Sequence, residues 1–314
     1  MTVTGIIILN FNSSSDTVKC IDSIVGHNSA PVKLIVVDNG SPDKQEVEKL
    51  DAYFSSTFGD QYRQIPEDAP ARPLSPVTFI TSPTNSGYAG GTNKGLKFAF
   101  ADDEIEDVII LNNDILFRSD IIPVLYEVRQ QVDKPAILTP LLIAPDGTVE
   151  HNCARSEPSN WSVMLPFLLF KKDIRHILTR QSSSQQILKQ SPQLKESPFF
   201  EIGLPSGSLM YVRKGLLQEM GGFDEGTFLY YEENILCKKL KKQGYRNYCV
   251  PSVKAVHIGG ASTGKTANLF LQKCSLESAD YYMSRFSGAS FPEMVLWKAI
   301  VALWKLKIFI KEHA

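Results

Sequence analysis

The first half of the chain alternates continuous apolar runs with amphipathic stretches. The apolar runs occupy residues 4–9, 32–37, 77–81 and 108–111. Helical patterns lie between them at residues 16–25, 45–54 and 93–100. Near-continuous apolar runs are typical of strands that are covered on both faces. The alternation therefore predicts a Rossmann-like α/β fold, in which a mostly parallel, doubly wound sheet is flanked by helices.

Residues 62–76 interrupt this alternation. The segment YRQIPEDAPARPLSP holds four of the 18 prolines in the chain, and each proline removes a backbone hydrogen-bond donor. We therefore predict an irregular surface excursion within the domain rather than a linker between domains.

Polar sequences follow all four predicted strands, in the order NFNSSSD, DNGSPD, SPTNSGYAGGTNKG and NND. Because parallel strands end at one edge of a sheet, we expect a ligand site there. Asp38 can accept hydrogen bonds from a ribose or a base, Asn10 can pair with a base and Phe11 can stack on it. Taken singly, each residue can equally cap a helix or end a strand.

Glycines gather after the third strand, in TNSGYAGGTNKG. Glycines before a helix let the backbone approach a diphosphate closely. The spacing fits neither the GxxxxGK[ST] nor the GxGxxG pattern, so it supports neither a P-loop nucleotidase nor a dinucleotide oxidoreductase. The alternative is a loop whose glycines only let a helix pack on a strand.

Carboxylates occur at two places where they could bind a metal ion or accept a proton. Asp114 follows the fourth strand and is our first candidate for holding a divalent cation. Glu232 and Glu233 are predicted to begin a helix that buries Ile235 and Leu236 and carries lysines toward its end. This polarity also describes an ordinary surface helix, since it complements the helix dipole. Beside the Asp114 edge, however, one of these acids can act as a general base.

Composition narrows the range of functions. A formal net charge of -1 in 314 residues provides no basic field for a polyanion, so we expect no nucleic-acid partner. The five cysteines show no CxxC spacing, which indicates reduced thiols in the cytoplasm rather than zinc or disulfides. The N-terminus has no signal-peptide pattern.

Two apolar segments are candidates for a surface contact. Residues 161–170 and 291–313 are rich in aromatic side chains, and Lys171, Lys172 and Arg175 adjoin the first of them. Both segments suit a peripheral contact with the inner face of the cell membrane. Neither suits a membrane-spanning helix. The alternative is a terminal helix that packs on the protein's own core or on a second subunit in a homodimer.

The ordered motifs of the chain resemble glycosyltransferase family 2, in particular its bacterial rhamnosyltransferase-like members. These motifs are IIILNFNS, IVVDNGS, NSGYAGGTNKG, ILNND, GGFDE, YYEENILCKKLKKQGY and HIGGAST. They spread from Gly5 to Thr263, with a poor fit from about residue 152 to 200. The resemblance implies a GT-A fold and an inverting transfer that needs Mg²⁺ or Mn²⁺. It also implies a dTDP- or UDP-sugar donor, with dTDP-rhamnose as the first expectation. The expected acceptor is a lipid-linked saccharide in bacterial surface polysaccharide synthesis, which a membrane contact of the two apolar segments would suit.

We expect a GT-A domain over residues 1–265 and a C-terminal helical segment over residues 266–314. Within the GT-A domain, residues 1–118 would form the nucleotide-sugar-binding half. Residues 119–265 would form the acceptor and catalytic half.

Residue by residue, the resemblance assigns roles at the strand ends. It implies donor contacts at Asn10, Phe11, Asn12, Asp38, Asn39, Asn85, Gly87, Tyr88, Gly91, Asn93 and Asn113. Asp114 matches the final acid of the family's metal motif, and His257 is the second candidate ligand, although a lone histidine is more often structural. Glu233 is assigned as the catalytic base, with Glu232 as the alternative.

The chain departs from the family pattern in two places. The metal motif NND holds one acid where the family usually has two, so we expect diphosphate and water to complete the cation's ligands. Ile235 stands where the family often has a further acid. These departures leave open a catalytically inactive nucleotide-sugar-binding scaffold. A sugar-phosphate nucleotidyltransferase is less favoured, because NFNSSSD contains neither arginine nor lysine.

Overall fold

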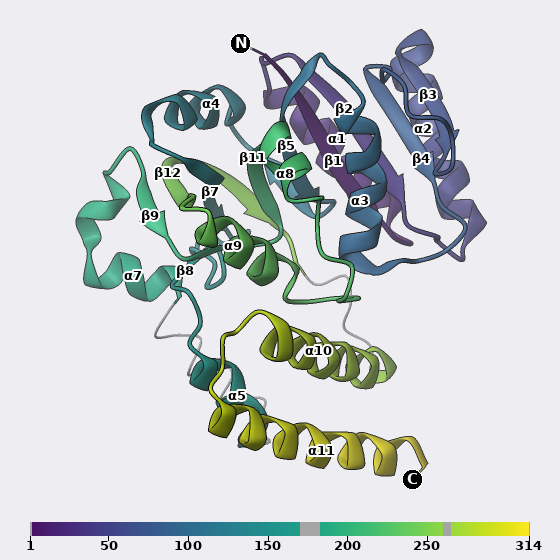
Figure 1. Cartoon of the computed structure of the whole chain (residues 1–314). Coiled ribbons are helices and arrows are strands. Elements are labelled where there is room, and N and C mark those ends of the chain that lie inside the picture. The colour runs from purple at the N-terminus through teal and green to yellow at the C-terminus, as the bar shows by residue number, and fades with distance from the viewer. Residues whose placement is uncertain (1, 170–182, 260–264, 314) are drawn as a thin grey trace.

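The computed structural model describes residues 2–169, 183–259 and 265–313, in which helices cover both faces of a central sheet (Figure 1). The strands are β1 (Val3–Asn10), β2 (Val32–Asp38), β3 (Tyr62–Pro66), β4 (Val77–Thr81), β5 (Ile105–Asn112), β6 (Ile115–Phe117), β7 (Pro135–Ile143), β8 (Ala154–Arg155), β9 (Phe200–Ile202), β10 (Leu204–Pro205), β11 (Leu209–Arg213) and β12 (Arg246–His257). The helices are α1 (Ser14–His27), α2 (Lys44–Phe58), α3 (Gly87–Phe100), α4 (Ile122–Gln131), α5 (Asn160–Leu168), α7 (Ser184–Gln190), α8 (Lys214–Glu219), α9 (Glu232–Lys242), α10 (Lys265–Arg285) and α11 (Phe291–His313).

The central sheet has the strand order β3-β4-β2-β1-β5-β11-β7-β12-β6, and β9 pairs with β12. Strands β3, β4, β2, β1 and β5 are parallel, which confirms the arrangement predicted for the first half. Strand β11 enters antiparallel between β5 and β7, and β12 again runs parallel to β7. The carboxyl ends of β1, β2, β4, β5 and β12 therefore lie at one edge of the sheet.

Two apolar clusters cover the two faces of this sheet. On one face, α1, α2 and α4 bury side chains such as Ile24, Phe54 and Leu125. On the other face, α3, α8 and α9 bury side chains such as Leu96 and Leu240. Because both faces are covered, the strands need apolar residues on both sides, and their sequences read as continuous apolar runs. The predicted α/β fold class is confirmed.

The prediction of an irregular excursion over residues 62–76 is wrong at its start. Tyr62–Pro66 forms the edge strand β3, parallel to β4. Ile65 is buried, and the ring of Tyr62 lies 5.4 Å from the ring of Phe54. An edge strand tolerates proline because only one of its sides pairs with a neighbour. Residues 67–76 contain neither helix nor strand, as predicted.

A layer of C-terminal helices lies beside the sheet. Helices α5, α10 and α11 share an apolar cluster that includes Leu276, Trp297 and Trp304. The indole N–H of Trp304 donates to the backbone oxygen of Phe167 at 2.7 Å. One face of the tail therefore packs on the protein's own helices. Among the residues described here, no helix combines the length and apolar character that crossing a membrane requires.

Some sequence predictions about this layer fall outside the described residues. Lys171, Lys172 and Arg175, which adjoin the first apolar segment, are among them. The GGAST part of the last family motif also lies mostly outside, since residues 260–264 are not described.

Helix α9 joins the C-terminal layer to the sheet. Leu236 and Leu240 belong to the cluster on the sheet, whereas Ile235 belongs to the cluster of the C-terminal helices. All three side chains are buried, as the sequence predicts. Ile235, which stands where the family often has an acid, therefore packs α9 on the C-terminal helices. Leu236 and Leu240 pack the same helix on the sheet.

The packing of Ile235 generates a test of stability. An Ile235→Asp substitution should lower the free energy of unfolding by about 3 kcal/mol or more, because it places a carboxylate without a designed partner in the core. Urea denaturation followed by circular dichroism measures this change. The Ile235→Val control should lose only about 0.5–1.5 kcal/mol. An aspartate variant as stable as the wild type would show that this position is not a core position.

Candidate active site

The pairing of β6 with β12 brings Asp114 next to His257. Ile115, the first residue of β6, pairs with His257, the last residue of β12. Asp114 immediately precedes Ile115, and its backbone oxygen accepts the N–H of Ile258 at 2.9 Å. The two candidate metal ligands are separated by 143 residues in sequence, yet they lie side by side at the edge of the sheet.

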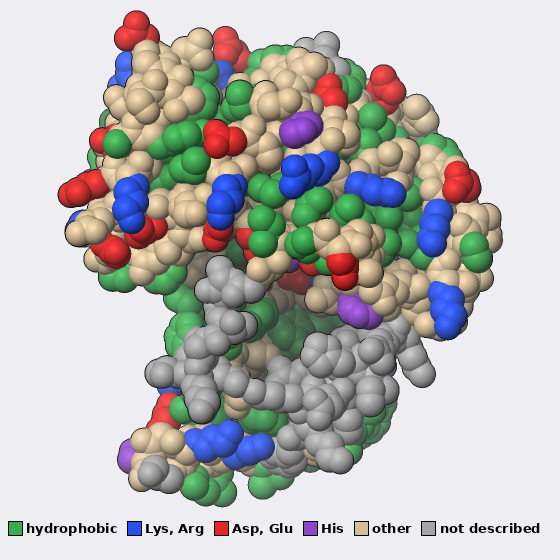
Figure 2. Space-filling model, turned by 180° about the vertical axis from the view of Figure 1, so that it is seen from behind, with side chains coloured by type: hydrophobic (Ala, Val, Ile, Leu, Met, Phe, Trp, Pro, Cys, Tyr) green, Lys and Arg blue, Asp and Glu red, His purple; other side chains and the backbone are tan. Residues whose placement is uncertain are grey.

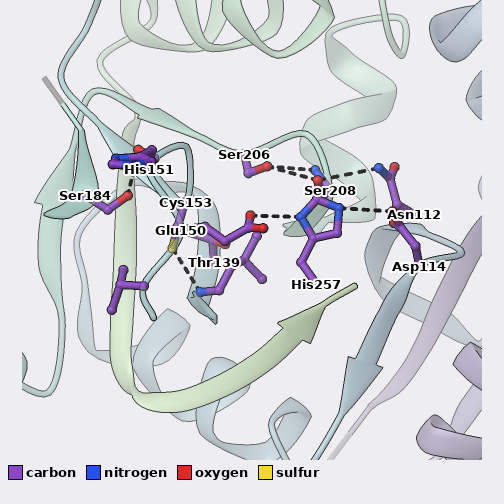
Figure 3. A network of polar contacts seen from close by, with 12 residues as sticks. Asn112, Asp114, Thr139, Glu150, His151, Cys153, Ser184, Ser206, Ser208 and His257 are labelled. Carbon is purple, nitrogen blue, oxygen red and sulfur yellow. Dashed lines mark hydrogen bonds and ion pairs between the residues drawn. The ribbon is translucent and has the colours of Figure 1, made fainter. Parts of the chain in front are cut away.

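His257 lies between two carboxylates (Figure 3). Its Nε2 is 3.2 Å from Asp114 Oδ2, and its Nδ1 is 2.8 Å from Glu150 Oε2. Glu150 follows the turn after β7, and its N–H donates to the oxygen of Leu142 at 3.0 Å. The backbone thus fixes the position from which Glu150 reaches the histidine.

The two carboxylates decide the charge of His257. Burial lowers the pKa of His257, but the hydrogen bonds and the negative charges of Asp114 and Glu150 outweigh burial and raise this pKa to about 10. The imidazole is therefore protonated at neutral pH and donates to both acids. A cation at Nε2 would have to take the place of that proton.

The residues at this point fit a cation that brings other ligands with it. Asp114 Oδ1 is buried and has no hydrogen-bond partner, and carboxylate and imidazole groups suit divalent ions. Glu150 contacts the opposite nitrogen of His257, so the three side chains do not converge. The described residues contain no group of three or more His, Cys, Asp or Glu that could hold a metal. Asp114 and His257 can thus supply two ligands, and phosphate and water would supply the rest.

Asn10 and Asp38 form a buried network at the ends of β1 and β2. The amide nitrogen of Asn10 donates to Asp38 Oδ1 at 2.9 Å, and Thr17 donates to Asn10 Oδ1 at 2.8 Å. Ser41 donates to Asp38 through its N–H and its hydroxyl. Asn10 is 0% exposed and Asp38 is 2% exposed. Both side chains thus shape the floor of the site, and their contacts with a base stay predictions.

Asn39 fixes the glycine-rich loop. Its Nδ2 donates to Asn85 Oδ1 at 3.0 Å and to the oxygen of Gly87 at 2.9 Å. Gly87 has a φ of +74°, and a Cβ at Gly91 would lie 2.8 Å from Asn39 Nδ2. These glycines are therefore needed for the packing of the loop and of α3. Their approach to a diphosphate stays a prediction.

The rim of the site carries one exposed aromatic ring. Phe11 is 46% exposed, so its ring is available for stacking. Asn12 is also exposed and adopts a φ of 49°, with its N–H bonded to Ser41 Oγ at 2.8 Å. Asn113 Nδ2 donates to Thr17 Oγ1 at 2.9 Å. Of these predicted donor residues, Phe11 and Asn12 are exposed, whereas Asn113 is partly buried.

Tyr88 and Asn93 connect the glycine-rich loop to the second half of the chain. Asn93 exchanges two hydrogen bonds of 2.9 Å with the backbone of Phe223. The hydroxyl of Tyr88 donates to the oxygen of Gly207 at 2.5 Å. Burial raises the pKa of Tyr88, and the charges of Glu232 and Glu233 add to this rise. Tyr88 therefore lies near the acids of α9, and its contact with a donor stays a prediction.

Glu232 and Glu233 have different surroundings at the start of α9. Glu233 Oε1 forms an ion pair with Arg155 at 2.9 Å, and its side chain is 17% exposed. Glu232 is 4% exposed, and burial, followed by the charge of Glu233, raises its pKa to about 8. Glu233 is thus partly open to a ligand. Glu232 is enclosed, and its raised pKa keeps it mainly protonated near pH 7.

A short loop links Glu233 to the Asp114 edge. The N–H of Asn112, two residues before Asp114, donates to the oxygen of Ser208 at 2.9 Å. A Cβ at the neighbouring Gly207 would lie 3.9 Å from Glu233 Oε2. The 206–208 loop thus lies beside both groups of candidate residues, and a Cβ at Gly207 would meet Glu233 at an ordinary van der Waals distance.

Two tyrosines just before α9 adopt a rare backbone conformation. Tyr230 has a φ of 77° and Tyr231 a φ of 71°, a region that bulky residues seldom occupy. Such strain clusters at functional sites, where surrounding contacts hold it. The ring of Tyr231 lies 5.3 Å from the ring of Tyr282 on α10, so the C-terminal layer supports this conformation.

Sequence reasoning missed Glu150 and Arg155. Arg155 lies in the stretch where the family resemblance is poor, Glu150 lies just before it, and neither belongs to a recognisable motif. Their partners are 107 and 78 residues away in sequence, so spacing carries no signal for these contacts. Only the positions of the two side chains in the fold reveal them.

Comparison with known families finds a match to the first part of the chain. A family model described as "Glycosyl transferase family 2" matches residues 5–139. This part of the chain is therefore similar to glycosyltransferase family 2. The matched range runs from β1 into β7 and thus includes the glycine-rich loop and Asp114.

One relative extends the comparison beyond the matched range. The "N-acetylglucosaminyl-diphospho-decaprenol L-rhamnosyltransferase" of Mycobacterium tuberculosis is 25% identical over 269 residues, which cover 82% of this chain and 76% of the relative.

Two solved structures show the same fold at 14% identity. GalNAc-T7 with UDP, GalNAc and Mn²⁺ has a TM-score of 0.57 over 93% of this chain, which spans only 53% of that structure. The mannosyltransferase PcManGT of Pyrobaculum calidifontis, in complex with GDP-Man and Mn²⁺, has a TM-score of 0.54, over 97% of this chain and 72% of that structure. The predicted GT-A fold is thereby confirmed.

The buried state of Glu232 predicts a pH dependence of stability. The folded pKa of about 8 exceeds the ordinary 4.5, so the stabilising contribution of Glu232 is fully present below pH 4.5 and is lost as the pH rises through the folded pKa. A Glu232→Gln variant should gain melting temperature relative to the wild type as the pH rises from about 5 to about 9. Differential scanning calorimetry across this range measures the difference. A difference that is constant with pH would contradict the assignment.

Proposed function

We propose that this protein transfers a sugar from a nucleoside diphosphate to a saccharide hydroxyl, with inversion at the anomeric carbon. The proposal rests on one observation: two sets of side chains with different chemistry lie beside the 206–208 loop. Asp114 and His257 suit a cation beside a diphosphate, and Glu233 suits a proton acceptor. A single displacement requires a leaving group and a base at opposite ends of the reacting centre.

The proposed donor is L-rhamnose carried on thymidine diphosphate, with a uridine diphosphate sugar as the alternative. The name of the mycobacterial relative supports rhamnose, and the nucleotides in the two related structures support a nucleotide-sugar donor. In this proposal the base stacks on the exposed ring of Phe11. The diphosphate follows the loop from Asn85 to Asn93.

A divalent cation would be held by Asp114 and His257. When bound, Mg²⁺ or Mn²⁺ would offset the negative charge that develops on the departing nucleoside diphosphate. The Mn²⁺ in both related structures supports this requirement. Glu150 keeps Nδ1 of His257 engaged, so Nε2 stays directed at Asp114, an arrangement that orients histidine ligands in many metal sites.

Glu233 would remove the proton of the acceptor hydroxyl. Its contact with Arg155 at 2.9 Å holds the carboxylate in one orientation and leaves Oε2 near Gly207. Glu232 is enclosed and protonated near neutral pH, so it serves the site as a neutral neighbour. This neutrality avoids a second negative charge beside the base.

The proposed acceptor is a saccharide linked to a lipid through a diphosphate, on the cytoplasmic side of the cell membrane. The name of the mycobacterial relative, which includes a sugar-diphospho-decaprenol, supports this class. The product would be an intermediate of a bacterial surface polysaccharide.

The base assignment predicts the behaviour of two isosteric variants. Glu233→Gln should lower sugar transfer by roughly 10²–10⁴-fold, the usual contribution of a general base, and should leave donor binding within about twofold of the wild type. Glu232→Gln is the matched control and should retain most activity, because the wild-type side chain is already neutral. Transfer from dTDP-rhamnose to a lipid-linked N-acetylglucosamine is followed by chromatography. Full activity of the Glu233 variant would eliminate this residue as the base.

The metal site predicts a second pair of variants. Asp114→Ala should weaken Mn²⁺-dependent nucleotide binding by about tenfold or more, because it removes a cation ligand. Glu150→Gln should weaken it by about tenfold, the lower range for a residue that orients a metal ligand. Isothermal titration with and without Mn²⁺ reports binding independently of catalysis. If both variants bound nucleotide with unchanged dependence on Mn²⁺, the metal assignment would be wrong.

A further inference from the structure

Helix α11 has two apolar faces. The inner face buries Trp297, Ile300, Val301, Trp304 and Ile308 in the C-terminal cluster. Because an α-helix turns by about 100° per residue, these five side chains lie within an arc of about 100°. They account for the packing of the tail on the protein.

The outer face of α11 is also apolar. Six large apolar residues on this face are more than half exposed, namely Phe291, Val295, Leu303, Leu306, Phe309 and Ile310. They lie within an arc of about 120° centred opposite Trp297. Packing among the described residues does not explain them, and a contiguous exposed apolar surface of this kind marks an interaction site.

Charged residues surround this outer arc in an ordered way. Lys298 and Lys305 fall on one flank of the arc, and Lys307 falls on the other. Lys298 forms an ion pair with Asp280 on α10 at 2.7 Å, and the ammonium of Lys307 lies 4.6 Å from the centre of the Trp304 ring. The acids Glu293 and Glu312 fall on the side of the helix that faces the protein, and Glu293 is bound to the N–H of Ser290 at 2.7 Å. Figure 2 shows basic and apolar side chains together along the lower edge of the molecule, where this layer lies. The outer face thus combines apolar side chains with positive flanks and no acid.

We propose that the outer face of α11 rests on an anionic lipid surface, with its apolar side chains below the headgroups and its lysines among them. Lysine side chains suit this position, since their stems are apolar and their ammonium groups reach the phosphates. A second copy of the chain would instead bring the same lysines together across a symmetric interface, and like charges would oppose it. This inference extends the proposed function, which places the acceptor's lipid in the same membrane.

The position of α10 connects the lipid surface to the candidate site. Helix α10 packs on α11, and its Ser278 donates to the oxygen of Leu229 at 2.8 Å. Tyr281, also on α10, donates to Asp224 at 2.8 Å. Both bonds hold the loop that precedes Glu232. A membrane contact at α11 would therefore be made by the same helical layer that supports the loop before the acids of α9.

Vesicle sedimentation tests this proposal with the full chain. The wild type should pellet with vesicles of phosphatidylcholine and phosphatidylglycerol, should bind pure phosphatidylcholine about tenfold more weakly, and should release at high salt. The double variant Leu306→Glu with Phe309→Glu should lose about tenfold or more of the partitioning. Val25→Glu is the matched control, because Val25 on α1 is a similarly exposed apolar residue, and this variant should bind as the wild type does.

The other outcomes overturn the proposal. Equal partitioning of the double variant and the wild type would exclude the outer face as the lipid contact. A wild-type dimer that ignores vesicles, and that the double variant converts to a monomer in sedimentation velocity, would identify a subunit interface instead. Absence of both vesicle binding and dimerisation would also contradict it. Nucleotide titration of the same proteins keeps this result separate from the proposed function, since the double variant should bind nucleotide normally.

Discussion

The register of β6 against β12 is the constraint on which the site depends. This pairing sets His257 opposite Ile115 and therefore beside Asp114. It works only because β12 runs parallel to β7, so that His257 reaches the same edge as the carboxyl ends of the first strands. A shift by one residue would turn His257 to the other face of the sheet. Strand β12, which comes late in the sequence, thus adds His257 to an edge formed mainly by strands of the first half of the chain.

Helix α9 connects the central sheet to the C-terminal helices. Its apolar side chains reach two clusters at once, since Leu236 packs on the sheet and Ile235 packs among the C-terminal helices. The acids at its start therefore sit where the two layers meet. Of the two strained tyrosines before it, Tyr231 packs against Tyr282 in the same C-terminal layer. The same helical layer that supports the acids presents the outer face of α11.

Much of the fold follows from local pattern, but the chemistry of the site follows only in part. The buried strands and α9 are predictable because apolar runs and end charges are local signals, whereas β3 is hidden by its proline and its short length. The candidate residues Asp114, His257 and Glu233 stand in motifs. Glu150 and Arg155 do not, because their roles arise from contacts between distant segments. The internal hydrogen bonds of Asn10, Asp38 and Asn39 are likewise invisible before the strands are placed.

The central claim is that this edge binds a nucleoside diphosphate together with a divalent cation. Calorimetric titration of the wild type with thymidine, uridine, guanosine and adenosine diphosphates, each with and without Mn²⁺, tests it most directly. The account predicts that a pyrimidine nucleotide binds most tightly and that its binding requires Mn²⁺. Absence of binding by all four, or binding that Mn²⁺ does not change, would contradict the account.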